Sequence, residues 1–429
     1  MNFLLKRRTF LPLFLTQFFG AFNDNAFKFA MLTLISYHLS STQTQSEHYQ
    51  ALAGALFTLP FFLFSATAGQ LADKYDKAVL TRWVKGAEIL LMVLGSFALT
   101  KGSIVLMMVT LTGMGVHSTF FGPIKYAILP DHLPRNYLLN ATGLIEASTF
   151  IAILLGTILG TLAIGNTRAH VTYAIVLINL AAVIGFVTSL FIPAAPARSQ
   201  TFDVDWHVWH ATISMIKNVI NNRQVFPAIL AISWFWLIGA IMLTKLPDYT
   251  HYVLGADTSV FALFLALFSI GIAAGSLTIS RLLAGQITLR FVPLSMLFLS
   301  IFAMDLYWAT PKPQLYLELP LLDLSHYLST FAHWRITLDF FLFSFCGGLF
   351  VVPLYTYLQV TGDDDRRART IAANNIYSAL SMVIGSVMVM IMLQLKLSIA
   401  AVFMVMAISN AIAAIALWCL LLTIRHLKP

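Results

Sequence analysis

The sequence predicts an all-helical protein that crosses a membrane many times. Hydrophobic residues make up 59% of its 429 residues and charged residues only 10%, and the mean hydropathy is +0.82. Soluble domains carry roughly 25% charged residues. Apolar stretches of about 20 residues, the length of a bilayer-spanning helix, recur along the whole chain. We expect twelve spans, at residues 10–37, 50–71, 83–100, 103–122, 139–163, 171–192, 227–247, 259–280, 291–309, 336–360, 371–394 and 399–424.

The basic residues predict the orientation of these spans. If the N-terminus is cytoplasmic, 19 of the 26 Lys and Arg residues fall on the cytoplasmic side or at its helix edges. The positive-inside rule therefore places both termini in the cytoplasm. The net charge of +8 then reflects topology and contact with anionic membrane lipids, and we expect no nucleic-acid partner.

The longest cytoplasmic connection divides the chain into two halves of six spans. We expect an N-terminal half at 1–192, a linker at 193–226 and a C-terminal half at 227–429. In the linker, Trp206, Trp209, Ile213, Ile216 and Ile220 fit one helical stripe, which predicts an amphipathic helix at the membrane surface.

Two dipeptides occupy corresponding places in the halves. Gly122-Pro123 is expected to end the fourth span and Val352-Pro353 the tenth. This weak similarity suggests two repeated halves. Transporters built from repeated halves place their substrate site between the halves, near the bilayer midplane.

The first span carries the most informative polar residues. Asp24 and Lys28 are four residues apart, so on a helix they share one face. Charges inside a bilayer are costly and persist where they pair or face a cavity. We expect Asp24 and Lys28 to bind charged groups of a substrate, with Asn23 and Asn25 adding hydrogen bonds. The alternative is that Asp24 and Lys28 only pair with each other.

Other ionisable residues also fall within the predicted spans. Glu146 is the stronger further candidate for the site, while Glu88 fits a local ion pair with Lys85. His117 fits either a buried core histidine or a proton relay, a role that Glu146 could share. Asp305 and Asp339 are expected near the outer surface as rim charges.

No catalytic constellation is present in the sequence. We find no nucleophile–base set, metal-ligand spacing or phosphate-binding loop, so we expect no enzyme activity, no cofactor and no metal site. Cys346 and Cys419 both lie in apolar segments and are expected to be small core residues, not a disulfide.

The loop after the second span resembles a family signature. Gly69 to Lys77, followed by Arg82, resembles the G-x-L-a-D-r-x-G-r-k motif of the major facilitator superfamily, although Asp76 replaces its usual second glycine. Gly69 would allow close helix packing, and Asp73 could meet a helix N-terminus or an arginine across the two halves. We expect Gly69, Asp73, Lys77 and Arg82 to control conformation.

Two longer stretches are similar to the bacterial lysophospholipid transporter family. They are Leu13 to Asn25 and Gly122 to Pro130, the second continuing through Leu133-Pro134, Asn140 to Glu146 and Gly156 to Gly160. The resemblance implies movement of lysophospholipid, such as lysophosphatidylethanolamine, from the outer to the inner leaflet of the bacterial inner membrane. By it, Asp24, Lys125 and Glu146 match the family pattern. For such a substrate we expect Asp24 to meet the ammonium and Lys28 the phosphate.

The expected partners follow from the same resemblance. They are an amphiphilic substrate, membrane lipids and a separate cytoplasmic acyltransferase, with the transporter itself a monomer. One alternative is a proton-coupled transporter of an amphiphile such as a siderophore or drug, with Asp24, Glu146 or His117 carrying the proton. A receptor that moves no substrate is disfavoured by the two halves and the buried charge.

Overall fold

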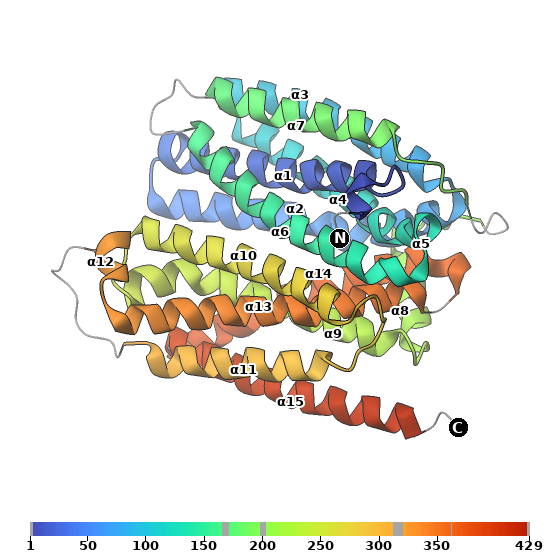
Figure 1. The fold of residues 1–429 in the computed structure, drawn as a ribbon. Helices are drawn as coiled ribbons and strands as arrows, with labels where there is room; N and C mark the ends of the chain where they lie inside the picture. The colour runs from blue at the N-terminus through green and yellow to red at the C-terminus, as the bar shows by residue number, and fades with distance from the viewer. Residues whose placement is uncertain (1–2, 165–170, 198–202, 312–320, 362, 427–429) are drawn as a thin grey trace. The chain divides into compact units, whose positions relative to one another are not determined.

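The computed structural model describes residues 3–164, 171–197, 203–311, 321–361 and 363–426, and long helices dominate it (Figure 1). These are α1 (Leu11–Leu34), α2 (Gln43–Lys74), α3 (Lys77–Lys101), α4 (Ile104–Ala127), α6 (Arg135–Ile164), α7 (Val171–Leu190), α9 (Phe226–Asp248), α10 (Thr258–Leu282), α11 (Val292–Ala309), α13 (Phe331–Val360), α14 (Arg367–Gln394) and α15 (Ile399–His426). Shorter helices are α5 (Leu129–His132), α8 (Val208–Ile220) and α12 (Leu324–Leu328). The all-helical fold class is confirmed.

Eleven of the described helices are long and apolar enough to cross a membrane. Helix α1 is not among them, because the polar run from Asn23 to Lys28 lowers its hydropathy. Its 24 residues would still extend about 36 Å, which exceeds the hydrocarbon thickness of a bilayer. Twelve spans are therefore consistent with the structure.

The chain forms two compact units. The first contains Met1–Leu230 and Leu358–Ala379, and the second contains Ala231–Tyr357 and Leu380–Pro429. The end of α13 and the start of α14 thus belong with the N-terminal helices, although they lie far along the sequence.

In the first unit, α1 lies beside α6 and α7, while α2 packs on α4. Glycines make the α1–α6 contact close. A Cβ at Gly156 would overlap the carbonyl oxygen of Phe22, and one at Gly160 would overlap that of Ala26. Small residues let helices approach backbone to backbone in a membrane, where lipid offers no hydrophobic drive for association.

The second unit uses the same device. A Cβ at Gly275 on α10 would overlap the carbonyl oxygen of Phe345 on α13, and one at Gly348 that of Ile272. Buried Asn410 on α15 fastens α11, because its amide donates to the carbonyl of Met296 at 2.7 Å and to the Ser300 hydroxyl at 2.8 Å.

Three sequence expectations need correction or restriction. Pro123 and Pro353 do not end their helices, since α4 and α13 continue past them; membrane helices tolerate proline where neighbours satisfy the freed backbone groups. Both cysteines are free as expected, but Cys419 is exposed and only Cys346 is buried. Residues 312–320, between the ninth and tenth expected spans, lie outside the described part of the chain.

Candidate functional site

Glu88 on α3 is the centre of a buried polar cluster in the first unit. Its carboxylate accepts a hydrogen bond from the Asn23 amide at 2.7 Å and pairs with the Lys85 ammonium at 2.7 Å. Asn23, Lys85 and Glu88 are all fully buried. Lys85 reaches this position because Gly20 has no side chain; a Cβ there would overlap the Lys85 ammonium. The expected Lys85–Glu88 pair therefore forms, and it also occupies the Asn23 amide.

A chain of polar side chains runs from this cluster to Asp24. The Nε2 atom of His117 on α4 lies 3.2 Å from Oε2 of Glu88, although it is not aligned as a hydrogen bond. Its Nδ1 lies 3.5 Å from the Ser118 hydroxyl, which donates to Oδ2 of Asp24. The other Asp24 oxygen, Oδ1, is buried and accepts no hydrogen bond from the described residues. Asp24 therefore retains an acceptor for another group.

Lys28 does not close onto Asp24. Within the described residues the two side chains form no salt bridge, although they are near enough to interact electrostatically. The Lys28 ammonium instead lies 5.6 Å from the ring centroid of Phe57 and 5.7 Å from that of Phe29. The alternative in which the pair only satisfies itself is thus not the arrangement seen. Asn25 is turned back to its own helix, donating to the carbonyl of Ala21 at 2.8 Å.

A second acid and base lie where α4 meets α6. The Tyr126 hydroxyl donates to Oε1 of Glu146, which is buried. The Lys125 ammonium lies 4.8 Å from the Tyr126 ring centroid and interacts electrostatically with Glu146 and Asp24. Among the described residues Lys125 makes no salt bridge, so no direct contact with an acid neutralises its ammonium.

Ser118, Tyr126 and Gln17 belong to this polar region and were not singled out from the sequence. Gln17 on α1 donates to the carbonyl of Ile145 on α6 at 3.2 Å and accepts from Thr149 at 3.0 Å. A polar residue in an apolar span was the available signal for each. Hydroxyls and amides are common in such spans, however, and spacing alone does not identify their partners.

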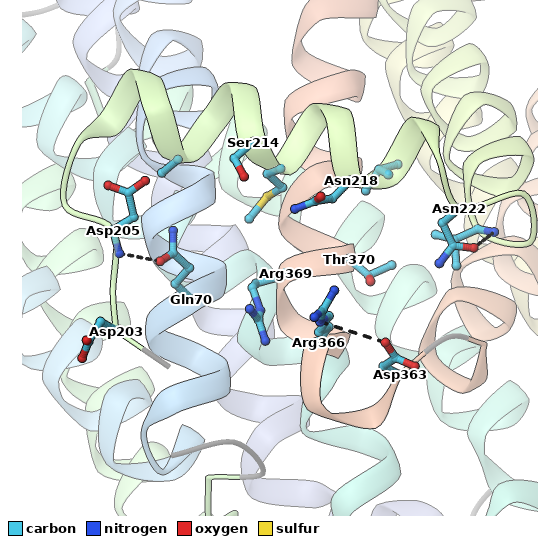
Figure 2. A pocket seen from close by; sticks show the side chains of 14 residues that line it. Gln70, Asp203, Asp205, Ser214, Asn218, Asn222, Asp363, Arg366, Arg369 and Thr370 are labelled. Atoms are coloured by element: carbon cyan, nitrogen blue, oxygen red, sulfur yellow. Dashed lines mark hydrogen bonds and ion pairs between the residues drawn. The ribbon is translucent and has the colours of Figure 1, made fainter. Parts of the chain in front are cut away.

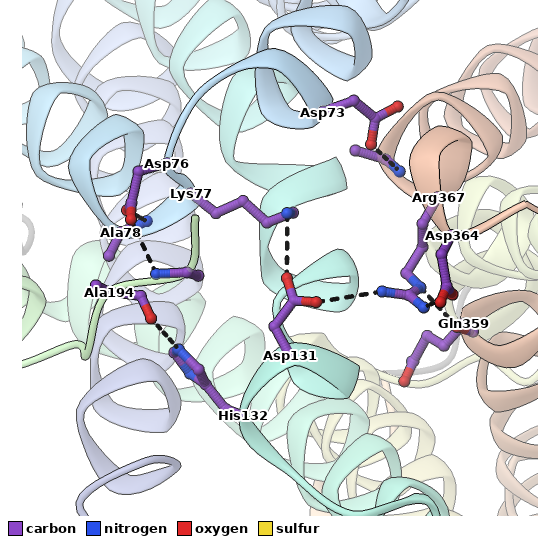
Figure 3. A network of polar contacts seen from close by, with 12 residues as sticks. Asp73, Asp76, Lys77, Ala78, Asp131, His132, Ala194, Gln359, Asp364 and Arg367 are labelled. Atoms are coloured by element: carbon purple, nitrogen blue, oxygen red, sulfur yellow. Dashed lines mark hydrogen bonds and ion pairs between the residues drawn. The ribbon is translucent and has the colours of Figure 1, made fainter. Parts of the chain in front are cut away.

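The signature loop binds the start of α14 (Figure 3). Asp73, which is almost fully buried, accepts from the backbone N–H of Ala368 at 2.9 Å and of Arg369 at 3.2 Å. The Arg369 guanidinium adds a third bond at 2.9 Å. Asp73 thus meets both of its expected partners, a helix N-terminus and an arginine. Gly69 allows the approach, because a Cβ there would lie 2.6 Å from the Cβ of Ala372.

Lys77 belongs to the same region through Asp131, which was not singled out from the sequence. Asp131 lies between two cations, 3.1 Å from Lys77 Nζ and 3.4 Å from Arg367, and Figure 3 shows it bridging them. Arg82 lies apart and donates to the carbonyl of Ile192 at 3.2 Å. Asp76, the departure from the motif, caps α3 by accepting from the N–H groups of Ala78 and Val79. Residues far apart in sequence are thus joined by buried charges.

A polar cavity of about 340 Å³ lies beneath α8 in the first unit (Figure 2). Its charged side chains already have partners: Asp363 lies 4.0 Å from Arg366, Asp203 lies 3.9 Å from Lys74, and Arg369 binds Asp73. The backbone N–H of Asp205 donates to Gln70 at 2.8 Å. Because these charges are satisfied, we place the candidate substrate site at Asp24, Lys28, Lys125 and Glu146 and not in this cavity.

Comparison with known proteins identifies the family. The model of the Major Facilitator Superfamily matches residues 13–386. The chain belongs to the major facilitator superfamily. It is a multi-pass membrane transporter, and no group of three or more potential metal ligands occurs in its described residues.

Relatives within this superfamily carry a more specific name. "Lysophospholipid transporter LplT" of Citrobacter koseri is 28% identical over 378 residues, covering 86% of this chain and 85% of that protein. The protein of the same name from Shigella flexneri is 27% identical over 376 residues, with the same coverage.

Solved structures agree on the superfamily fold. The human organic anion transporter MFSD10 (TETRAN) matches with a TM-score of 0.75 at 14% identity, covering 95% of this chain and 98% of that one. The Escherichia coli fucose:proton symporter FucP matches with a TM-score of 0.69 at 13% identity and the same coverage. At these identities the likeness concerns the fold alone.

Proposed function

We propose that this transporter moves lysophospholipid from the outer to the inner leaflet of the bacterial inner membrane by alternating access. The observation that carries the proposal is a set of charges in the first unit that do not touch an opposite charge. Asp24 and Glu146 are acids, and Lys28 and Lys125 are bases. None of the four makes a salt bridge to another described residue. The names of the relatives support the same substrate class.

Separated opposite charges complement a zwitterionic head. Lys28 and Lys125 present ammonium donors to a phosphate, and the vacant Oδ1 of Asp24 accepts from a substrate ammonium. A phosphate held by Lys28 would leave its acyl chain near the aromatic rings of Phe29 and Phe57. The site therefore combines separated opposite charges with apolar surface, which complements a one-chain phospholipid.

The contacts at Asp73 and Lys77 fit a conformational gate. They tie the signature loop and α5 to the segment 358–379 through buried ion pairs and capping bonds. We propose that these bonds hold one state of the transport cycle and separate in the other. Gly69, Asp73 and Lys77 then act in the gate, while Arg82 bonds the segment that follows α7.

The test is uptake of two lipids by the purified full chain in proteoliposomes. Lysophosphatidylethanolamine carries an ammonium and lysophosphatidylglycerol does not. Asp24→Asn is expected to lower uptake of lysophosphatidylethanolamine by roughly 10- to 100-fold, because one hydrogen bond to a charged group is lost. Uptake of lysophosphatidylglycerol should not change. Lys28→Gln is expected to lower both, because both lipids carry the phosphate.

Two exposed substitutions are the matched controls. Lys101→Gln and Asp203→Asn remove the same charges at exposed positions and should leave uptake unchanged. Wild-type uptake of both lipids by folded Asp24→Asn and Lys28→Gln would refute the headgroup assignment. An equal loss for both lipids in Asp24→Asn would indicate a structural role for Asp24.

The polar chain through His117 favours a second candidate, a proton-coupled transporter of an amphiphile such as a drug or siderophore. Glu88, His117, Ser118 and Asp24 form a row in which neighbouring polar atoms lie within 3.5 Å of each other, and a proton could pass along this row once His117 turns to bond Glu88. Uptake driven only by an imposed proton gradient, with no uptake of lysophospholipid, would select this function.

The remaining expectations follow from the proposed substrate. A lysophospholipid delivered to the inner leaflet needs re-acylation, so we propose a separate cytoplasmic acyltransferase as partner. We also propose that the transporter acts as a monomer of two sequence halves, 1–192 and 227–429, joined by the linker.

A further inference from the structure

Asp339 on α13, in the second unit, is a buried acid far from the proposed headgroup site in sequence. Only 6% of the residue is exposed, and its Oδ2 atom has no hydrogen-bond partner among the described residues. The sequence suggested a solvated rim charge. A buried carboxylate without a cation is costly, so its charge requires another explanation.

The nearest cation is engaged elsewhere. Arg335 lies one helical turn before Asp339 and could pair with it, but both branches of its guanidinium donate to Asp305 on α11, one at 2.9 Å. The side chains of Arg335 and Asp305 are 52% and 29% exposed, so this pair contacts water. Arg335 is therefore already neutralised by Asp305.

Asp339 is close enough to Asp305 to interact with it, and its Oδ2 atom has no bonded cation among the described residues. Two ionised carboxylates only accept hydrogen bonds and repel each other, so a proton on one of them removes this repulsion. Tyr249 from the end of α9 also lies near Asp339, and its hydroxyl is engaged with Thr310 at 2.8 Å. Among the described residues, the groups acting on Asp339 thus comprise one guanidinium and a second acid.

We propose that Asp305 and Asp339 share one proton and form a proton-binding site of this transporter. Two carboxyls and one guanidinium carry a net negative charge, which one bound proton removes. Asp305 and Arg335 give this proton access to water at the end of the span, and Asp339 holds it beneath them. The site lies in the second unit and requires neither Asp24 nor a particular substrate.

The test is infrared spectroscopy of the full chain reconstituted in lipid, without substrate. Wild-type protein is expected to show the carbonyl band of a protonated carboxylic acid, which disappears as the pH is raised. Asp339→Asn should lack this band and remain folded, because asparagine has the shape of the neutral acid. Asp339→Glu should restore the band. Asp203→Asn, which removes a fully exposed carboxylate, should leave it unchanged.

The outcomes separate a proton from a metal ion and from no ligand. Titration at constant pH with sodium chloride, against choline chloride, should not alter the band. Displacement of the band by sodium would overturn the proton assignment in favour of a sodium site. A wild-type spectrum without the band, or an unchanged band in Asp339→Asn, would overturn the proposal. None of these results depends on lysophospholipid transport.

Discussion

Replacing Asp73 by asparagine tests whether the signature loop holds the start of α14. In the structure the Asp73 carboxylate accepts three bonds, from two backbone N–H groups and the Arg369 guanidinium. Asparagine keeps one oxygen acceptor but has no charge. Its amide nitrogen would also face the backbone N–H groups and the guanidinium, which are donors and cannot accept from it.

The magnitude follows from the lost bonds. A hydrogen bond to a charged group contributes about 1.5–3 kcal/mol. The oxygen of the asparagine side chain would still accept one hydrogen bond, without the charge. We count less energy for the lost Arg369 bond, because the Arg369 side chain is partly exposed to solvent. We expect a loss of about 2–4 kcal/mol, which raises the population of the separated state roughly 30- to 700-fold at 1.4 kcal/mol per tenfold.

Thiol labelling measures this population. Ala372 is fully buried where Gly69 meets α14, so Ala372→Cys in a chain without Cys346 and Cys419 reports separation. Asp73→Asn is expected to speed labelling by the factor above, up to the rate of a fully exposed thiol. Asp76→Asn is the matched control, because Asp76 lies in the same loop but caps α3.

Two labelling results would contradict the role of Asp73. Labelling of the Asp73→Asn chain within about twofold of its parent would show that these bonds do not hold the contact. An equal acceleration in Asp76→Asn would show that the loop as a whole, and not the carboxylate of Asp73, controls access to Ala372.

Two further predictions concern packing and pH. Gly156→Ala should lower the free energy of unfolding by about 1–3 kcal/mol in thermal denaturation, since its Cβ would overlap the Phe22 carbonyl; Gly54→Ala, with open space around it, should not destabilise. The hydrogen bond from His210 lowers the pKa of the partly exposed Asp205 carboxyl below its usual 3.8. The bonds to ionised Asp205 therefore stabilise the folded protein above pH 3.8. They are lost as the pH falls through the lowered pKa of Asp205. The fluorescence emission of the neighbouring tryptophans should stay constant down to about pH 4 and change only below it. The Asp205→Asn chain should not show this change.

The signature loop was largely predictable from sequence. Its acid has two physical partners in such a place, a helix N-terminus and an arginine, and Asp73 binds both. Asp131 was not predictable, because its two cations, Lys77 and Arg367, come from distant parts of the chain. Only the packing of these segments brings the three charges together.

The first helix shows the limit of local spacing. Asp24 and Lys28 have the separation of an ion pair on a helix, yet they form none. Ser118 from α4 donates to Asp24, while the rings of Phe29 and Phe57 lie near the Lys28 ammonium. These contacts differ from the local prediction because neighbouring helices supply other partners.

The sequence by itself determined the all-helical membrane fold, the superfamily motif and the identity of the charges within the spans. These are local properties, since a span depends on about 20 consecutive side chains and their transfer from water. Tertiary structure alone decided how most of the other charges are neutralised. Asp131 lies between Lys77 and Arg367, Asp24, Lys28 and Lys125 stay apart, and Asp339 interacts with another acid. The reason is that inside a membrane protein each charge is balanced by whichever helix is packed against it, and that packing is not local in sequence.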